Sequence, residues 1–228
     1  AQEQPWQALE GLRERLRLIP KAVQWLASTR VQPPRRVPMR GGRARGVHHD
    51  GGNAAEILAS DRTMLAEVAR WFAHDEIGRD LRTEQAGTDQ RLLLGPLGLA
   101  SRRVDLCDTG EGMGHVLPVL VSAALARRAA AADEPAFVAV EDPEAHLHEN
   151  ARRALAAHLC TIAAGDSPPT LVLESHSRTF LLEVQKAVAE KRLSADRVAI
   201  VWVSESEGHA SETQTVSLDA LGRLESPA

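Results

Sequence analysis

The sequence has no tyrosine, only two cysteines and no long apolar run. Cys107 and Cys160 stand at unrelated positions, so we expect reduced thiols in a reducing compartment. No apolar run reaches the ~18 residues that a membrane helix needs, and no signal-peptide pattern opens the chain, which favours a cytoplasmic protein with no membrane partner. A net charge of −4 argues against a surface that binds nucleic acid all over, but it leaves room for a local basic patch. The 228 residues, 43% of them apolar, can bury one sizeable core.

Two segments in the second half of the chain are short apolar runs that end abruptly in polar residues. The first is 137–140, followed by Glu141 and Asp142, and the second is 170–173, followed by Glu174, Ser175 and His176. Such runs are typical of buried parallel strands whose carboxyl ends open into a ligand site. One carboxylate at the strand tip can hold Mg²⁺ while the other orients an attacking water. This pattern indicates nucleotide chemistry at one edge of a sheet.

A third segment, 108–118, places Gly110, Gly112 and Gly114 directly before a long Ala/Leu/Val run. Glycines before a helix let the backbone approach an anion closely, and the free amides with the helix dipole then favour phosphate. The plainer interpretation is a glycine turn that caps a helix. The position of this segment, one helix before Glu141, favours the phosphate interpretation.

Taken together, the three segments resemble ABC-type ATPases, most closely the stand-alone bacterial ATPases related to the OLD (overcoming lysogenization defect) and SMC families. The run 141–148, Glu-Asp-Pro-Glu-Ala-His-Leu-His, is similar to their Walker B segment, and 174–177, Glu-Ser-His-Ser, is similar to their H-loop. Segment 108–118 is similar to their signature motif, which precedes Walker B by one helix. Two features depart from the pattern: Gly114 and His115 stand at the usual Ser and Gln positions, and Glu-Asp replaces the usual Asp-Glu.

The resemblance implies ATP and Mg²⁺ as cofactors and hydrolysis of ATP between two copies of the domain. Glu141 would take the Walker B position and help to coordinate Mg²⁺ through water, Asp142 would be the catalytic base, and His176 would contact the γ-phosphate. The signature residues would close over the ATP of the partner copy; they are Gly110, Gly112, Met113, Gly114 and His115. Such proteins use ATP as a clamp switch coupled to DNA or to an effector such as a nuclease, often in phage defence or DNA repair.

The chain contains no Gly-x-x-x-x-Gly-Lys-[Ser/Thr] motif, the Walker A loop that cradles phosphates. The nearest candidate, 40–46, has neither the spacing nor the lysine. We therefore expect the carboxy-terminal half of a longer ATPase, inactive by itself, with the loop supplied by an upstream segment or another subunit. Two other functions stay open: a non-hydrolysing dimerisation scaffold that regulates a partner nuclease, and a DNA-binding clamp.

The same motifs also have plainer interpretations. An acidic pair at a strand end is often a helix N-cap or a solvated turn. His146 and His148 suggest zinc, but no third ligand lies at suitable spacing, so they are interpreted as local structure and dimer contact. The Glu-Ser-His-Ser run resembles a hydrolase fragment, but no Gly-x-Ser-x-Gly elbow accompanies it.

The fold class expected is α/β: a P-loop NTPase core with a mostly parallel sheet flanked by helices, and an N-terminal helical lobe. Residues 1–90 would form the lobe and a basic connector, and 91–228 the carboxy-terminal half of the ATPase domain. Strands are predicted at 91–94, 101–107, 136–141, 170–174, 197–203 and 212–218, and helices at 113–131, 149–164 and 177–191. The last strand is predicted to close the sheet as its edge.

The first 90 residues predict helices around an irregular basic segment. Residues 6–27 read as amphipathic helix broken at Pro20, with leucines and an isoleucine at positions 9, 12, 16 and 19 on one face. Residues 31–52 are predicted to be irregular, and Asn53 with Glu56 to cap a helix, followed by a second helix through 65–72. The connector is the most basic part of the chain, either a solvated loop or a phosphate-binding segment; its arginines are Arg30, Arg35, Arg36, Arg40, Arg43 and Arg45.

Overall fold

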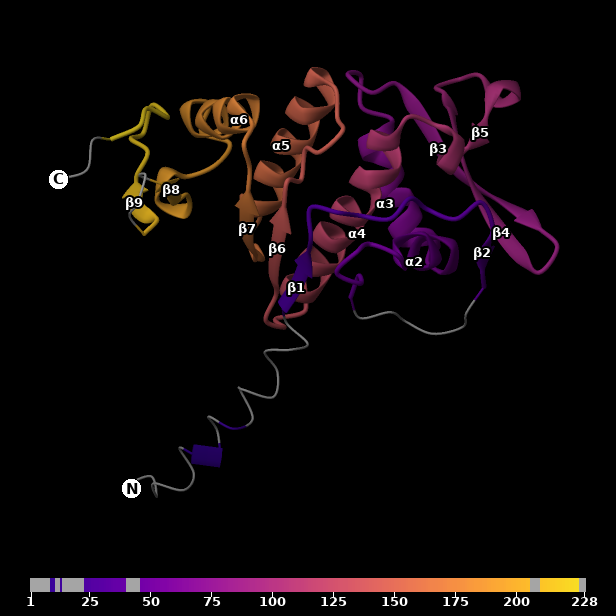
Figure 1. Cartoon of the computed structure of the whole chain (residues 1–228), viewed down its shortest axis with the longest axis horizontal. Helices are drawn as coiled ribbons and strands as arrows, with labels where there is room; N and C mark the ends of the chain where they lie inside the picture. The colour runs from indigo at the N-terminus through magenta and orange to yellow at the C-terminus, as the bar shows by residue number, and fades with distance from the viewer. Residues whose placement is uncertain (1–8, 11–12, 14–22, 40–45, 206–209, 226–228) are drawn as a thin grey trace.

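Three parallel strands form the sheet at the centre of the molecule (Figure 1), in the order β1-β6-β7. They are β1 (Val23–Leu26), β6 (Phe137–Glu141) and β7 (Thr170–Glu174), and the computed structural model describes residues 9–10, 13, 23–39, 46–205 and 210–225. The predictions for 136–141 and 170–174 are confirmed. The prediction of helix up to residue 27 is wrong at its end. Val-Gln-Trp-Leu is a run of good strand formers, and pairing with β6 buries Leu26 completely.

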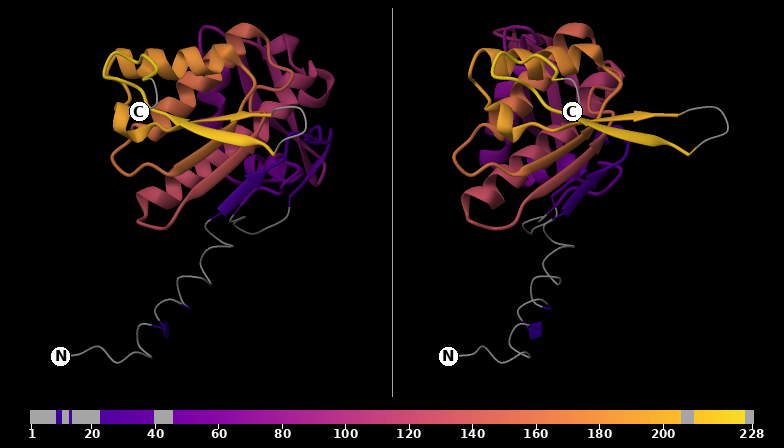
Figure 2. Two further views of the ribbon diagram at one scale, coloured as in Figure 1. Left: turned by 60° about the vertical axis from the view of Figure 1, so that its left-hand side comes forward. Right: turned by 90° about the vertical axis from the view of Figure 1, so that its left-hand side faces the viewer.

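Helices cover one face of this sheet. The predicted helices are confirmed as α4 (Glu111–Ala131), α5 (Glu149–Ala163) and α6 (Arg178–Ala189). α4 is buried on most sides and packs against α2 (Ala54–Ser60) and α3 (Arg62–Phe72). In the right-hand view of Figure 2, the helices gather on one side of the strands.

A second, antiparallel sheet was not expected. It has the order β2-β4-β3, with β5 paired to β4; the strands are β2 (Val37–Pro38), β3 (Arg79–Ala86), β4 (Asp89–Pro96) and β5 (Val104–Asp105). β4 confirms the strand predicted at 91–94. The strand predicted at 101–107 is wrong except at β5, because short 3-10 turns occupy Ala100–Arg102 and Leu106–Asp108. The expectation of a mostly parallel sheet therefore holds only for the central strands.

The last two strands, β8 (Ile200–Ser204) and β9 (Glu212–Val216), form an antiparallel hairpin. Their existence was predicted, but not their partner. Among the described residues they pair only with each other, so β9 does not close the parallel sheet as its edge.

One hydrophobic core joins β1, β6 and α2 to α5, so α2 and α3 do not form a separate lobe. A smaller cluster lies between α5, α6 and the C-terminal segment. The N-terminal helix predicted at 6–22 lies outside the described residues except at 9–10 and 13. The domain division at residue 90 stays a prediction, and residues 90 and 91 both lie in β4. In the described part of the chain, no helix has both the length and the apolar character to cross a bilayer.

Candidate functional site

The predicted acidic pair lies in a tight turn at the carboxyl end of β6. Glu141 ends the strand, and its carboxylate accepts hydrogen bonds from Trp25 Nε1 and the Ser28 amide, both at 3.1 Å. Asp142 has a left-handed backbone with φ of 42°, and its amide donates to the Glu174 carbonyl of β7 at 3.0 Å. No described donor reaches the Asp142 carboxylate. Glu141 is thus fixed by neighbours, whereas the Asp142 carboxylate is available.

Arg30 lies behind this turn and is almost fully buried, with 3% exposed. Its guanidinium donates to the carbonyl oxygens of Glu141 at 2.8 Å, Asp142 at 2.7 Å and Ala27 at 3.1 Å. Burial lowers the pKa of Arg30, and the nearby charges of Asp142, Glu144 and Glu141 oppose this shift. A fixed positive charge therefore holds the backbone of the acidic pair.

Glu144 adds a third carboxylate that the sequence interpretation gave no role. It is 6% exposed, and its Oε1 accepts a hydrogen bond of 2.6 Å from the Ser175 hydroxyl at the end of β7. Its Oε2 is buried without a partner among the described residues. Glu144 and Ser175 thus link the turns that follow β6 and β7.

His176, the predicted γ-phosphate contact, follows β7 and is largely exposed. Its Nε2 lies 3.9 Å from Glu174 Oε1. Because β6 and β7 pair in register from Phe137↔Thr170 to Glu141↔Glu174, the histidine lies at the same sheet edge as the acids. The geometry leaves its imidazole accessible to a ligand.

The glycine-rich segment opens α4 beside the same turn. Gly110 is the N-cap residue and makes no side-chain cap, and a Cβ built there meets nothing within 4 Å. A Cβ at Gly112 would lie 2.4 Å from the His146 carbonyl oxygen, and one at Gly114 would overlap the Gln32 side chain. Gly112 and Gly114 are therefore required for close packing within the chain, and Gly110 is the open position.

Two histidines fill the space between α4 and the acidic turn. The rings of His115 and His146 meet edge to face, with centroids 4.7 Å apart. His146 Nδ1 lies 3.2 Å from Glu111 Oε2, and His115 Nδ1 is buried without a described partner. Burial lowers the pKa of His115, and the charges of His146 and Arg30 lower it further. His115 thus packs against His146 and does not line the cavity in front of α4.

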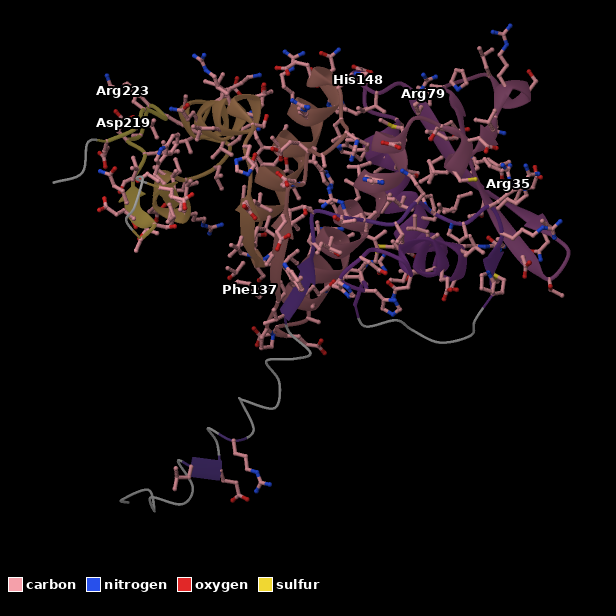
Figure 3. The ribbon with its side chains drawn as sticks, viewed as in Figure 1. Arg35, Arg79, Phe137, His148, Asp219 and Arg223 are labelled. Atoms are coloured by element: carbon pink, nitrogen blue, oxygen red, sulfur yellow. The ribbon has the colours of Figure 1, made fainter. Side chains whose placement is uncertain are left out.

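An open cavity of about 970 Å³ lies in front of α4 and α5. Its wall includes Gly110, Gly112 and Met113 from the predicted signature, but not Gly114 or His115. Arg79 and His148, labelled in Figure 3, contribute from β3 and from the N-cap of α5. α5, like α4, has no side-chain cap at its first turn. The cavity therefore opens on uncapped amide groups and on side chains of both signs, with Glu76 and Glu149 beside Arg79 and Arg102.

The structure brings Glu141, Asp142 and His176 together and places the signature segment against their turn. Sequence reasoning missed Trp25, Ser28, Arg30, Glu144 and Ser175 as parts of the site. Glu144 was visible inside the motif, and its spacing of two residues from Asp142 was the available signal. Among the described residues, no group of three or more His, Cys, Asp or Glu side chains is arranged as a complete metal site.

In the part of the basic connector that the structure describes, two arginines bond within the chain, so this part is not a free cationic loop. Arg30 is buried, and Arg35 forms ion pairs with Asp105 at 2.7 Å and Asp108 at 2.6 Å. Arg36 is exposed, while Arg40, Arg43 and Arg45 lie outside the described residues. Two of the six arginines thus hold the fold together.

The predicted capping pair of α2 forms differently from the prediction. Asn53 stands at the N-cap, but its side chain makes no cap hydrogen bond to the helix. Its Oδ1 accepts from the His48 amide at 2.7 Å and its Nδ2 donates to the Gly46 carbonyl at 3.1 Å. Asn53 therefore fixes the preceding loop.

Comparison with known proteins shows a likeness of fold. No protein-family model and no curated protein matches the chain. Among solved structures, an Smc head bound to the C-winged helix domain of ScpA matches with a TM-score of 0.50 and 13% identity, over 72% of this chain and 45% of that one. An Smc head with an extended coiled coil from Pyrococcus furiosus, bound to the C-terminal domain of ScpA, gives 0.49 and 13%, over 72% and 37%. The chain spans less than half the length of these two structures. Its fold resembles, at low identity, that of the Smc head: α/β, with a parallel sheet flanked by helices.

Proposed function

We propose that this chain is the Walker B, signature and H-loop part of an ABC-type ATPase of the OLD/SMC-like group, which binds and hydrolyses ATP with Mg²⁺. One observation carries the proposal. The carboxyl ends of β6 and β7 bring Glu141, Asp142 and His176 to one sheet edge, against the glycine-rich start of α4. Ligands of open parallel sheets bind at this edge.

The residues present fit a magnesium ion. Mg²⁺ prefers oxygen ligands and usually keeps several waters, so one or two carboxylates suffice in a phosphate site. Glu141 and Asp142 supply such carboxylates at the strand tip. When bound, the ion would offset phosphate charge. Trp25 and Ser28, which donate to the Glu141 carboxylate, would hold it in place as a ligand.

Asp142 and His176 would perform the remaining chemistry. The Asp142 carboxylate, without a described hydrogen-bond donor, would accept a hydrogen bond from the attacking water and orient it. The exposed His176 would donate a hydrogen bond to the γ-phosphate. Both interactions strengthen in the transition state, so they accelerate hydrolysis more than they tighten binding.

The proposal also needs the phosphate-cradling amides and the lysine of a Walker A loop, a motif that the sequence lacks. Among the described strands, β7 pairs on one side only, with β6. A parallel strand added along the other side of β7 would end beside Glu174 and His176. A loop following that strand would face the acidic turn, which supports a Walker A loop supplied by another segment or subunit.

A titration of the 228-residue chain with ATP and Mg²⁺ by calorimetry tests the need for that loop. The P-loop amides and lysine supply most phosphate contacts in such enzymes, so we expect no micromolar affinity. Micromolar binding by this chain would contradict the assignment of a missing loop.

Hydrolysis is tested in the assembly that includes the Walker A loop. Asp142→Asn and His176→Ala are each expected to reduce turnover by at least ~10-fold while ATP affinity is kept. Asp133→Asn is the matched control, because Asp133 also has a left-handed backbone, with φ of 59°, but precedes β6. Unchanged turnover in both site variants would place the chemistry elsewhere.

Coupling of this ATPase to DNA or to an effector nuclease extends the proposal by analogy with the group. A non-hydrolysing scaffold would bind its partner equally well with Asp142→Asn. A clamp that binds DNA through the connector would rely on fewer cations than the sequence suggests, since Arg30 and Arg35 bond within the chain.

A further inference from the structure

The backbone of His176 spans a short gap between two fixed points. β7 ends at Glu174, whose carbonyl oxygen accepts a hydrogen bond of 3.0 Å from the Asp142 amide. Ser177 is the N-cap of α6, where its hydroxyl caps the first turn of the helix. Only Ser175 and His176 lie between these two points, so the position of this loop depends on few contacts.

The imidazole of His176 is not fixed by contacts of its own. Its side chain is 81% exposed, and its Nε2 lies 3.9 Å from Glu174 Oε1, which is beyond hydrogen-bond distance. An exposed side chain can adopt several rotamers, so the direction of the imidazole depends first on the backbone that carries it. A residue that fixes this backbone therefore acts on His176 without touching a ligand.

Ser175 fixes the backbone of His176 through two hydrogen bonds. Its hydroxyl oxygen accepts from the Ser177 amide at 3.1 Å, and it donates to Glu144 Oε1, in the turn after β6, at 2.6 Å. A hydroxyl group has one donor and two lone pairs, so both bonds can form at the same time. Serine hydroxyls that bond a nearby backbone amide form tight local turns. His176 thus lies inside a turn that Ser175 closes and Glu144 anchors.

Glu144 is suited to anchor this turn because it is itself buried, with 6% exposed. Among the described residues, the Ser175 hydroxyl is the only hydrogen-bond donor to its carboxylate. Carboxylate acceptors make shorter and stronger hydrogen bonds than neutral oxygens. Burying a carboxylate is unfavourable, and an apolar side chain would fill the same space at a lower cost in free energy. Packing alone therefore does not explain a glutamate at this position.

We propose that Glu144 and Ser175 are positioning residues for His176. Glu144 holds the Ser175 hydroxyl where its oxygen receives the Ser177 amide, and the resulting turn keeps the imidazole at the sheet edge on which Asp142 lies. That the imidazole then meets a γ-phosphate rests on the proposed function. The turn itself needs no nucleotide, so it can be tested in this chain alone.

Amide hydrogen exchange of Ser177, followed by NMR in the 228-residue chain without nucleotide, tests the turn. Ser175→Ala removes the acceptor, and Glu144→Leu removes the anchor but keeps a large side chain. Each is expected to speed exchange at Ser177 by at least ~10-fold, whereas Ser175→Thr, which keeps the hydroxyl, should retain the slow rate. Thr179→Val is the matched control, because the Thr179 hydroxyl also donates to a carboxylate, Glu149 Oε1, at 2.6 Å, but closes no turn around His176.

The exchange rates decide each part of the proposal. Equal rates at Ser177 in the parent chain and in Ser175→Ala would overturn it. Exchange that Thr179→Val speeds as much as Ser175→Ala does would also overturn it, because any lost contact between these segments would then loosen the loop. An effect of Ser175→Ala without an effect of Glu144→Leu would contradict the role of Glu144.

Turnover in the assembly that contains the Walker A loop shows whether the turn acts through His176. Ser175→Ala is expected to lower kcat at least ~10-fold with little change in KM for ATP, and Ser175→Thr to retain kcat. In a His176→Ala background, Ser175→Ala should cause no further loss, because a positioning residue has no effect once the group that it positions is absent. Losses that multiply would overturn the proposal, as would an unchanged kcat in Ser175→Ala where His176→Ala is impaired. If His176→Ala itself left turnover unchanged, the proposed function would fail, while the exchange rates would still decide whether Glu144 and Ser175 hold the turn.

Discussion

At the scale of single residues, the acidic turn depends on Arg30. Its guanidinium bonds three carbonyl oxygens on two chain segments more than 100 positions apart. Every residue has a backbone carbonyl oxygen, so the sequence does not indicate which of them would accept hydrogen bonds from Arg30. Arg30 fixes both β1 and the left-handed backbone of Asp142, which directs the Asp142 carboxylate.

Replacing Arg30 by methionine is expected to lower the free energy of unfolding by about 1–3 kcal/mol, because the carbonyl oxygens of Ala27, Glu141 and Asp142 lose their charged donor. Urea denaturation followed by circular dichroism measures the change. Arg36→Met, at an exposed position of the same segment, is expected to cost under about 0.5 kcal/mol. Equal, small effects of both substitutions would show that the Arg30 contacts do not hold the turn.

Gly112 and Gly110 are expected to have different roles: Gly112 allows close packing against the acidic turn, whereas Gly110 is open to a ligand. Gly112→Ala would bring a methyl group to 2.4 Å from the His146 carbonyl, and overpacking of this kind costs about 1–3 kcal/mol. Gly110→Ala, where the Cβ meets open space, is expected to change stability far less. Urea midpoints of the two variants provide the comparison, and a Gly112→Ala midpoint equal to the parent's would mean that α4 does not approach the turn so closely.

The positions of Glu141, Asp142 and His176 could be predicted because polar residues directly follow apolar runs, and this signal is local. The partners of Glu141 could not. Trp25 and Ser28 lie 116 and 113 positions away, and the pairing of β1 with β6 that brings them close has no sequence signature. Arg30 was included among solvated arginines because charge alone does not distinguish a buried guanidinium from an exposed one.

At the scale of elements, length and periodicity determined what could be foreseen. α5 and α6 are apolar on one side, α4 is a long and almost uniformly apolar helix, and β6 and β7 are short apolar runs. β1 has only four residues, and its apolar residues continue the helical spacing of the segment before it. It was therefore predicted as the end of a helix. β3 is polar except for Leu81 and Ala86, so its sequence lacks an alternating apolar pattern, and its hairpin with β4 was not predicted.

α5 provides a prediction about pH. Burial lowers the pKa of His158 to about 4, so the folded state excludes a proton that the unfolded chain binds below its ordinary value of 6.5. The free energy of unfolding is therefore not reduced by His158 above pH 6.5. As the pH falls from 6.5 toward 4, it decreases by at most about 3 kcal/mol. His158→Gln should flatten the urea-derived stability profile between pH 6.5 and 4. A parallel slope in parent and His158→Gln would contradict the burial of a neutral imidazole.

At the scale of the whole molecule, the site faces outward. The cavity, the uncapped start of α4 and the acidic turn all lie at the surface, and β7 has an unpaired side among the described strands. If two copies sandwich ATP as proposed, the start of α4 would meet the phosphate held by the partner, and a two-fold axis would make both sites equivalent.

Gly110 is the position at which that assembly can be tested without disturbing the fold. Substitution at Gly114 would first displace Gln32, so its effect on assembly would be ambiguous. A Cβ at Gly110 meets no atom within 4 Å, and an aspartate at an N-cap stabilises a helix through its hydrogen bond and the dipole. The same carboxylate would repel the phosphate of a partner's ATP. Stability and assembly should therefore change in opposite directions.

Gly110→Asp in the assembly that contains the Walker A loop, with Asp142→Asn to prevent turnover, is expected to weaken ATP-dependent dimerisation at least ~10-fold in light scattering while the urea midpoint stays equal or rises. Gly110→Asn, of the same size and capping ability but neutral, should keep the dimer. If Gly110→Asp dimerises as well as Gly110→Asn, residues 108–118 serve only to start α4, because a like charge at a phosphate contact cannot be neutral in its effect.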